Sequence, residues 1–248
     1  MSAYGPLCTE FYDNDKPFAP ADAVEYYAQR AFAAGGRVLE PMCGSGRFLL
    51  PLLRSGIEVE GVDDASAMLE ACRRHAAKNK LNPVLYKQSV EALALPWRYQ
   101  MAFVPSGSIG LLERDSLKNA LSSVLHHLEP GAPLLLELAV FDDGLDGEES
   151  LDPRVVQIDE ETRIVYRCNA RLSGEQDSIH YDGRYEKWRN AELLAVEEEA
   201  LVLWKHEPAA FLQVLRDCGY VRAHVVDGEP YASLRASGCL LIEAYAET

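Results

Sequence analysis

The sequence of 248 residues predicts a doubly wound α/β fold, in which helices cover both faces of a mostly parallel sheet. Short apolar runs alternate with longer stretches of helical periodicity through the first 140 residues. A second kind of segment follows, in which apolar and polar residues alternate as in antiparallel strands. Hydrophobic residues make up 48% of the chain, which is enough to close a packed core.

The first elements can be assigned in order along the chain. The segment 1–20 mixes aromatic residues with turn formers and lacks sustained periodicity, so we expect it to be irregular. From Asp22, the expected N-cap, apolar residues recur at helical spacing until Gly35 stops the helix. The later strands are expected over 37–40, 57–63, 84–86, 101–104 and 134–138, and the helices between them over 48–53, 65–80 and 117–128.

The pattern changes after Val140. An acidic, turn-rich linker over 142–153 precedes runs that alternate apolar with polar residues, and we expect three or four antiparallel strands that cover or extend the site. These runs cover 155–158, 162–170, 178–188 and 192–203, and a final helix over 208–218 and strands over 220–227 and 239–245 follow. The expected fold is a mostly parallel sheet whose last strand is antiparallel, with an antiparallel β insertion after the fifth strand. Its expected divisions are 1–140, 141–206 for the insertion, and 207–248 for the elements that complete the sheet.

Composition restricts the partners and the compartment. Residues 1–140 hold 13 basic and 16 acidic residues, whereas residues 141–248 hold 11 and 23, so the acidity lies in the C-terminal part. Nucleic-acid affinity depends on basic side chains that neutralise phosphates, so we expect no nucleic-acid partner. The six cysteines are scattered, which predicts free buried thiols and no metal site. No run approaches the roughly 18 apolar residues of a membrane span, and we expect a cytoplasmic protein without membrane contact.

The most informative motif is Glu40-Pro41-Met42-Cys43-Gly44-Ser45-Gly46, which is followed by a strand that ends in Asp63. A nicotinamide-binding turn carries a third glycine three positions after the second, and it has no acid before the turn. Leu49 occupies that third position here, and Glu40 stands at the end of the strand. An acid directly before the glycine turn suits a ligand that has a positively charged end.

This motif and the order of elements over 22–140 resemble the class I S-adenosylmethionine-dependent methyltransferases, which have a Rossmann-like fold. The resemblance implies that Glu40 lies near the methionine moiety of the cofactor and that Asp63 accepts hydrogen bonds from the ribose hydroxyls. Val90 stands where this family often has an acid, so adenine would be held by backbone groups and Glu91. The cofactor contacts that the resemblance implies are Tyr12, Glu40, Met42, Cys43, Gly44, Gly46, Asp63, Asp64, Met68, Val90, Glu91 and Pro105.

The resemblance also implies the reaction. A methyl group would pass from S-adenosylmethionine to a small molecule, with nitrogen as the first expectation for the acceptor atom and oxygen or sulfur next, and S-adenosylhomocysteine would be the product. The segment 105–108 differs from the Asn/Asp-Pro-Pro-Tyr type that similar enzymes use for the amine of a base or of glutamine. In layout, the insertion resembles that of small-molecule N-methyltransferases, including those that act on amino sugars.

Several alternatives stay open at this point. Tyr12 and Ser106 are the candidates for a catalytic role, and similar enzymes often fold a tyrosine from this N-terminal region over the cofactor as a lid. An aromatic residue packed on the surface is an equally good interpretation of Tyr12. The acids Glu197, Glu198 and Glu199 are expected to form a solvated face. The chain could instead be a non-catalytic module that binds the cofactor or its product, or an NAD-dependent oxidoreductase, and we also allow for a homodimer.

Overall fold

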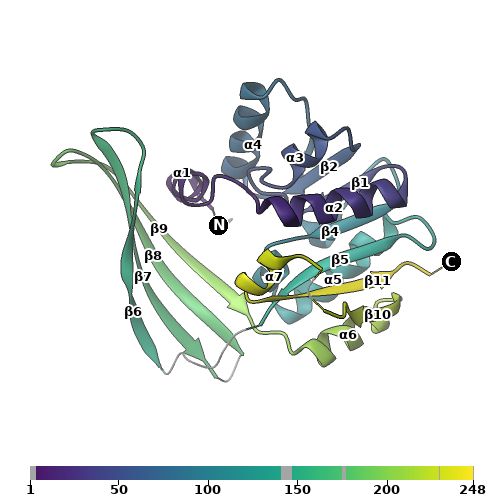
Figure 1. Cartoon of the computed structure of the whole chain (residues 1–248). Coiled ribbons are helices and arrows are strands. Elements are labelled where there is room, and N and C mark those ends of the chain that lie inside the picture. The colour runs from purple at the N-terminus through teal and green to yellow at the C-terminus, as the bar shows by residue number, and fades with distance from the viewer. Residues whose placement is uncertain (1–3, 141–146, 175–176, 229, 248) are drawn as a thin grey trace.

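The computed structural model describes residues 4–140, 147–174, 177–228 and 230–247, and these form two sheets with their helices (Figure 1). The main sheet has seven strands in the order β10-β11-β5-β4-β1-β2-β3, and the neighbours from β5 to β3 are parallel. Its strands are β1 (Val38–Pro41), β2 (Val59–Asp63), β3 (Val84–Lys87), β4 (Met101–Val104), β5 (Pro133–Ala139), β10 (Val221–Val225) and β11 (Cys239–Tyr245). Strand β11 runs antiparallel to β5, so the predicted doubly wound sheet with an antiparallel last strand is confirmed.

Helices cover both faces of this sheet. The helices of the described chain are α1 (Pro6–Asp15), α2 (Ala21–Ala34), α3 (Leu49–Arg54), α4 (Ser66–Lys78), α5 (Arg114–His126), α6 (Pro208–Asp217) and α7 (Ala232–Ala236), with the 3-10 helices η1 (Val90–Ala92) and η2 (Ser108–Leu111). One core cluster joins the sheet to α5 and α6, and a second joins its other face to α2, α3, α4 and α7. Leu134 and Leu136 belong to the first cluster and Leu135 to the second, because successive residues of a strand point to opposite faces. The central strands therefore consist largely of apolar residues, as is typical of a sheet covered on both sides.

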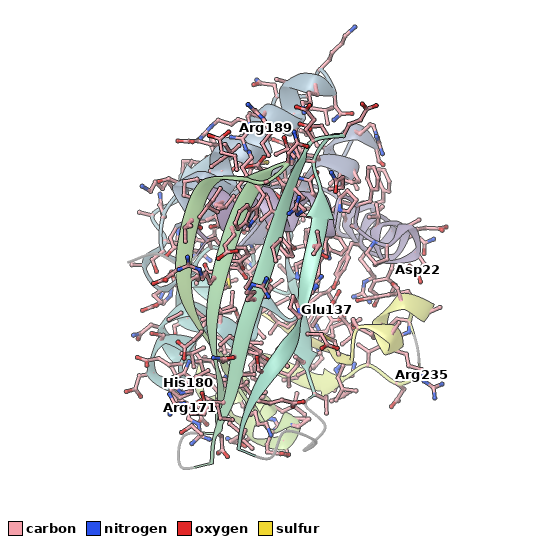
Figure 2. The ribbon with its side chains drawn as sticks, turned by 90° about the vertical axis from the view of Figure 1, so that its left-hand side faces the viewer. Asp22, Glu137, Arg171, His180, Arg189 and Arg235 are labelled. Carbon is pink, nitrogen blue, oxygen red and sulfur yellow. The ribbon has the colours of Figure 1, made fainter. Side chains whose placement is uncertain are left out.

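The insertion forms a separate four-stranded antiparallel sheet in the order β6-β7-β8-β9. Its strands are β6 (Glu148–Gln157), β7 (Thr162–Ser173), β8 (Ser178–Arg189) and β9 (Glu192–Trp204). Figure 1 shows this sheet beside the main domain, and Figure 2 shows its outer face. The expected linker was wrong over 148–153, which belongs to β6, while residues 141–146 lie outside the described part. Acids and a proline are tolerated there because β6 is an edge strand with a bulge between Leu151 and Arg154.

The N-terminal segment departs from its predicted irregular structure, because Pro6–Asp15 is the helix α1. A helix of this length is marginal in isolation, so its stability has to come from packing. The side chains of Leu7, Cys8 and Phe11 form a third cluster with apolar residues of β6, β7 and β8. In Figure 1, α1 lies between this insertion sheet and α4.

Several acids also have partners that the sequence pattern did not reveal, and Glu199 is one of them, since its Oε2 atom accepts a hydrogen bond from the hydroxyl group of Tyr185 (3.3 Å). Glu197 is not a purely solvated residue, because its carboxylate accepts hydrogen bonds from the backbone N–H groups of Leu7 (3.0 Å) and Cys8 (2.9 Å) at the start of α1. Asp22 is not the N-cap of α2, since Pro20 has that position. Instead, Asp22 Oδ2 accepts a hydrogen bond from the backbone N–H of Ser233, 2.8 Å away in α7, a helix that was not expected.

The expectation of free thiols is confirmed, since all six cysteines are unpaired and five of them are buried. Among the helices of the described residues, none is both long and apolar enough to cross a membrane.

Candidate functional site

A cavity of about 350 Å³ lies at the carboxyl ends of β1, β2 and β4, where open α/β sheets bind their ligands. Its lining includes every expected cofactor contact except Gly46, and it also includes the candidate Ser106. The turn after β1, the ends of the strands, the N-terminal helix and strand β9 all contribute to its walls. The geometry therefore brings residues from distant parts of the chain to one place.

Glu40 lies in β1 and is 2% exposed, yet its Oε2 atom has no hydrogen-bond partner. Burial raises the pKa of this carboxyl well above its usual range, the charge of Arg47 opposes the rise and that of Asp63 adds to it. A buried carboxylate oxygen without a partner is costly, so such an atom is expected where a ligand supplies the missing donor. Glu40 therefore suits the positively charged end of a ligand.

Arg47 is a residue of the cavity that the sequence pattern did not indicate, although it directly follows the glycine turn. Its Nη2 atom donates to Ser106 Oγ at 2.9 Å, and its guanidinium carbon lies 5.8 Å from the ring centroid of Tyr12. Its Nε atom is buried and has no partner. Among the described residues that line the cavity, Glu40 thus carries an unpartnered buried acceptor and Arg47 an unpartnered buried donor.

Asp63 ends β2 and holds the turn after β1 in place. Its Oδ2 atom accepts a hydrogen bond from the backbone N–H of Gly44 (2.8 Å), and its Oδ1 atom accepts one from that of Ala65 (2.9 Å). Burial raises the pKa of this carboxyl, while the two backbone hydrogen bonds oppose the rise. Each carboxylate oxygen can accept a further hydrogen bond, so Asp63 can position the turn and bind hydroxyl groups together.

The backbone is strained at three non-glycine residues of the cavity, and Tyr4, before α1, is one of them with a φ of 67°. Met42, after β1, has a φ of 59°, and Ser106, after β4, has a φ of 61°. Left-handed conformations of this kind cost about 1–3 kcal/mol, and they persist where the surroundings hold them, commonly at functional sites.

Gly46 is the expected contact that does not line the cavity. It has a φ of 82°, and a Cβ atom at this position would lie 2.5 Å from Cys72 Sγ in α4. Gly46 thus permits close packing of the turn against α4. Leu49, at the position of the missing third glycine, is fully buried in the core.

The cavity has further walls that the sequence did not indicate. Tyr4 joins the expected Tyr12 at the N-terminal end, and burial raises the pKa of both phenols. Residues of β9 and of the segment around η2 form further parts of the wall, and near adenine's expected place Gln88 and Ser89 adjoin Val90. The additional lining residues are Tyr4, Ser45, Arg47, Phe48, Val62, Gln88, Ser89, Ser108, Leu111, Leu112, Ala200, Leu201 and Val202. The alternation of apolar and polar residues along a strand does not show which face of the strand lines a cavity. The place of β9 in the cavity wall could therefore not be predicted from the sequence.

A contact between α1 and α4 predicts pH-dependent docking of the N-terminal helix. His75 Nε2 lies 3.2 Å from Asp13 Oδ2, and this hydrogen bond raises the pKa of His75, partly opposed by burial. The contact is at full strength below the ordinary histidine pKa of about 6.5 and is lost as pH rises through the raised value. We expect His75→Gln to lower Tm at about pH 6 and to leave Tm unchanged at about pH 9. A Tm difference between variant and wild type that is constant over this range would contradict the assignment.

Comparisons with known proteins agree with this geometry. Residues 38–131 match the family model described as a methyltransferase domain. The ubiquinone biosynthesis O-methyltransferase of Xanthomonas euvesicatoria pv. vesicatoria (strain 85-10) is 30% identical over 99 residues, which are 38% of this chain and 41% of the relative. A putative methyltransferase of Bacillus subtilis (strain 168) is 23% identical over 228 residues, which are 89% of this chain and 90% of the relative.

Among solved structures, the SAM-bound amino pentose methyltransferase of Micromonospora echinaspora, involved in calicheamicin biosynthesis, superimposes with a TM-score of 0.72. The superposition covers 99% of both chains at 18% sequence identity. The likeness includes the insertion, and it establishes the fold of the whole chain.

Proposed function

We propose that this chain transfers a methyl group from S-adenosylmethionine to a small acceptor molecule, because residues 38–131 match the family model of a methyltransferase domain and the chain has the fold of a solved methyltransferase. The proposal includes the expected cofactor contacts around the cavity. It also includes S-adenosylhomocysteine as the product that leaves the same site.

The pair of unpartnered buried atoms in the cavity supports this cofactor most directly. S-adenosylmethionine ends in an amino acid, which presents an ammonium group and a carboxylate close together. Glu40 Oε2 would accept from the ammonium group, and Arg47 Nε would donate to the carboxylate. Asp63, at the end of β2, would accept hydrogen bonds from the ribose hydroxyls.

The residues of this chain would act mainly by positioning. When bound, S-adenosylmethionine supplies a methyl group on a positively charged sulfur, and its transfer is an in-line displacement. Holding two reactants in line can provide a large part of the rate enhancement. Pro105 and Ser106 lie at the end of β4, Leu111 belongs to η2, and Leu201 of β9 lines the same cavity, so the acceptor would enter between these residues. The cover of α1 and β9 would limit the access of water.

Nitrogen is our first proposal for the acceptor atom, followed by oxygen and sulfur. A structural neighbour that covers nearly the whole chain is named an amino pentose methyltransferase, which favours an amine on a small molecule. The relative named an O-methyltransferase matches 38% of this chain, so it says less about the acceptor side. We propose no nucleic-acid or membrane partner, and a cytoplasmic location.

Calorimetric titration with S-adenosylmethionine, S-adenosylhomocysteine and NAD tests the cofactor. We expect saturable binding of the first two and none of NAD. Transfer from S-adenosylmethionine with a radiolabelled methyl group, screened over amines, phenols and thiols, then tests the reaction. Binding without transfer to any acceptor would favour the non-catalytic module, and failure to bind either S-adenosyl compound would refute the proposal.

A further inference from the structure

Glu137 is a buried acid next to the cavity that does not line it. It lies in β5 and is 3% exposed, and Figure 2 places it in the main domain behind the insertion sheet. The pairing of Val104 with Leu136 is the last one between β4 and β5. Glu137 therefore lies beside the point where β4 ends and the chain turns through Pro105 and Ser106.

The two oxygens of Glu137 have different partners. Oε1 accepts hydrogen bonds from the hydroxyl groups of Tyr27 (2.8 Å) and Tyr231 (2.6 Å), which come from α2 and from the residue before α7. Oε2 accepts one from the backbone N–H of Ser106, at 2.7 Å. One oxygen thus joins helices to the sheet, while the other holds the turn at the cavity.

Ser106 connects this carboxylate to Arg47. Its left-handed φ of 61° is unfavourable for a serine and requires an external restraint, which the hydrogen bond to Glu137 provides. Its hydroxyl oxygen accepts the hydrogen bond from Arg47 Nη2. The direction of the Arg47 guanidinium, whose Nε atom is unpartnered, therefore depends on the placement of the Ser106 backbone.

We propose that Glu137 is a positioning residue of the cofactor site: by holding the backbone of Ser106, it directs the guanidinium of Arg47 toward the carboxylate of the cofactor's amino-acid end. The inference rests on the proposed function, since it assigns the group that Arg47 binds. A carboxylate that only fastened helices to the sheet would need no bond to this turn. The hydrogen bond from the Ser106 N–H to Glu137 Oε2 is therefore not explained by a role in fastening the helices to the sheet.

Two ligands separate positioning from general stability. S-adenosylhomocysteine carries the amino-acid end, whereas 5′-methylthioadenosine has the same nucleoside and sulfur without it. We expect Glu137→Met, which removes both acceptor oxygens at similar volume, to weaken S-adenosylhomocysteine binding by about 10-fold or more. Affinity for 5′-methylthioadenosine should change by less than about 3-fold. Equal losses for the two ligands, or no loss for either, would overturn the proposal.

Matched variants distinguish the two oxygens. Glu137→Gln keeps an oxygen for the Ser106 N–H and should restore affinity for S-adenosylhomocysteine to within about 3-fold of wild type. The double variant Tyr27→Phe, Tyr231→Phe removes the Oε1 contacts, and it should lower Tm without changing that affinity. If the tyrosine variant loses as much affinity as Glu137→Met, Glu137 is structural and the proposal fails.

A double-mutant cycle tests the route through Arg47. In an Arg47→Ala background, Glu137→Met should have no further effect on S-adenosylhomocysteine binding, because the group that it positions is gone. If Glu137→Met has the same effect on affinity in that background as in the wild type, the route through Arg47 is refuted.

If Glu137→Met does not fold, Ser106→Ala replaces it. This variant keeps the backbone hydrogen bond to Glu137 but removes the acceptor for Arg47, so it should weaken the binding of S-adenosylhomocysteine more than that of 5′-methylthioadenosine. Absence of binding to the wild type would instead refute the proposed function itself.

Discussion

Asp63→Ala should abolish measurable binding of S-adenosylmethionine, with a loss of affinity of about 100-fold or more. The substitution removes two functions at once. The acceptor for the ribose hydroxyls is lost, and the backbone N–H groups of Gly44 and Ala65 lose their partners. A buried donor without a partner costs about 1–3 kcal/mol, and the turn that faces the ligand loses its fixed geometry. Calorimetric titration of the variant, beside the wild type at equal salt, measures the loss.

Two control variants limit the interpretation. Asp63→Asn keeps one acceptor oxygen, so its affinity for S-adenosylmethionine should lie between those of Asp63→Ala and the wild type. Asp64→Ala changes the neighbouring acid, which lines the cavity but is exposed, and it should weaken binding by only a few-fold. An Asp64→Ala loss as large as that of Asp63→Ala would contradict the role assigned to Asp63.

The main sheet could be predicted because its signals are local. The strand Met101–Val104 is a short apolar run between Gln100 and Pro105, and its observed bounds coincide with the expected ones. The glycine turn follows β1, and Asp63 is the last residue of β2. Because β1 and β2 are parallel neighbours, the turn and Asp63 lie at the same edge of the sheet, and this could be predicted from the sequence.

The residues that were missed depend on distant contacts. The helix α1 has its stability from the insertion sheet, and nothing within residues 6–15 indicates that partner. Glu197 resembles a solvated acid until the start of α1 is brought to it. Arg47 stands beside the motif in sequence, but its role appears only when Ser106 and Tyr12 are placed against it. Such roles follow from tertiary packing, which periodicity does not encode.

The N-terminal helix and the insertion also form one structural unit over the cavity. The third hydrophobic cluster joins α1 to β6, β7 and β8, and it is separate from both cores of the main sheet. Lys187 of β8 pairs with Glu10 at 2.7 Å, which adds a polar contact to the same unit. Since Tyr4, Tyr12 and Leu201 all line the cavity from this unit, its docking on the main domain determines the shape of this part of the cavity.

Glu40→Gln should have opposite effects on the free protein and on cofactor binding. Burial raises the pKa of Glu40, so between the unfolded value of about 4.3 and the raised value the folded state holds a proton that the unfolded state has released. The free energy of unfolding then falls as pH rises, by up to about 1.4 kcal/mol per pH unit, and the loss is complete above the raised pKa. Because glutamine does not ionise, the free energy of unfolding of Glu40→Gln does not fall with pH in this way. The variant should therefore have the higher Tm at about pH 8 and a Tm similar to that of the wild type at about pH 4.

Binding should show the reverse order. An ammonium group beside Glu40 favours its ionised form, so cofactor binding within that pH range expels a proton and the wild-type affinity rises with pH. Glu40→Gln should bind about 10- to 100-fold more weakly at about pH 8, with no proton release from this site. Titrations in two buffers of different ionisation enthalpy count the protons, and the wild-type minus variant difference excludes the contribution of Asp63, whose raised pKa is common to both. Equal proton release by the two proteins, or equal affinity at alkaline pH, would show that Glu40 does not hold the ammonium group.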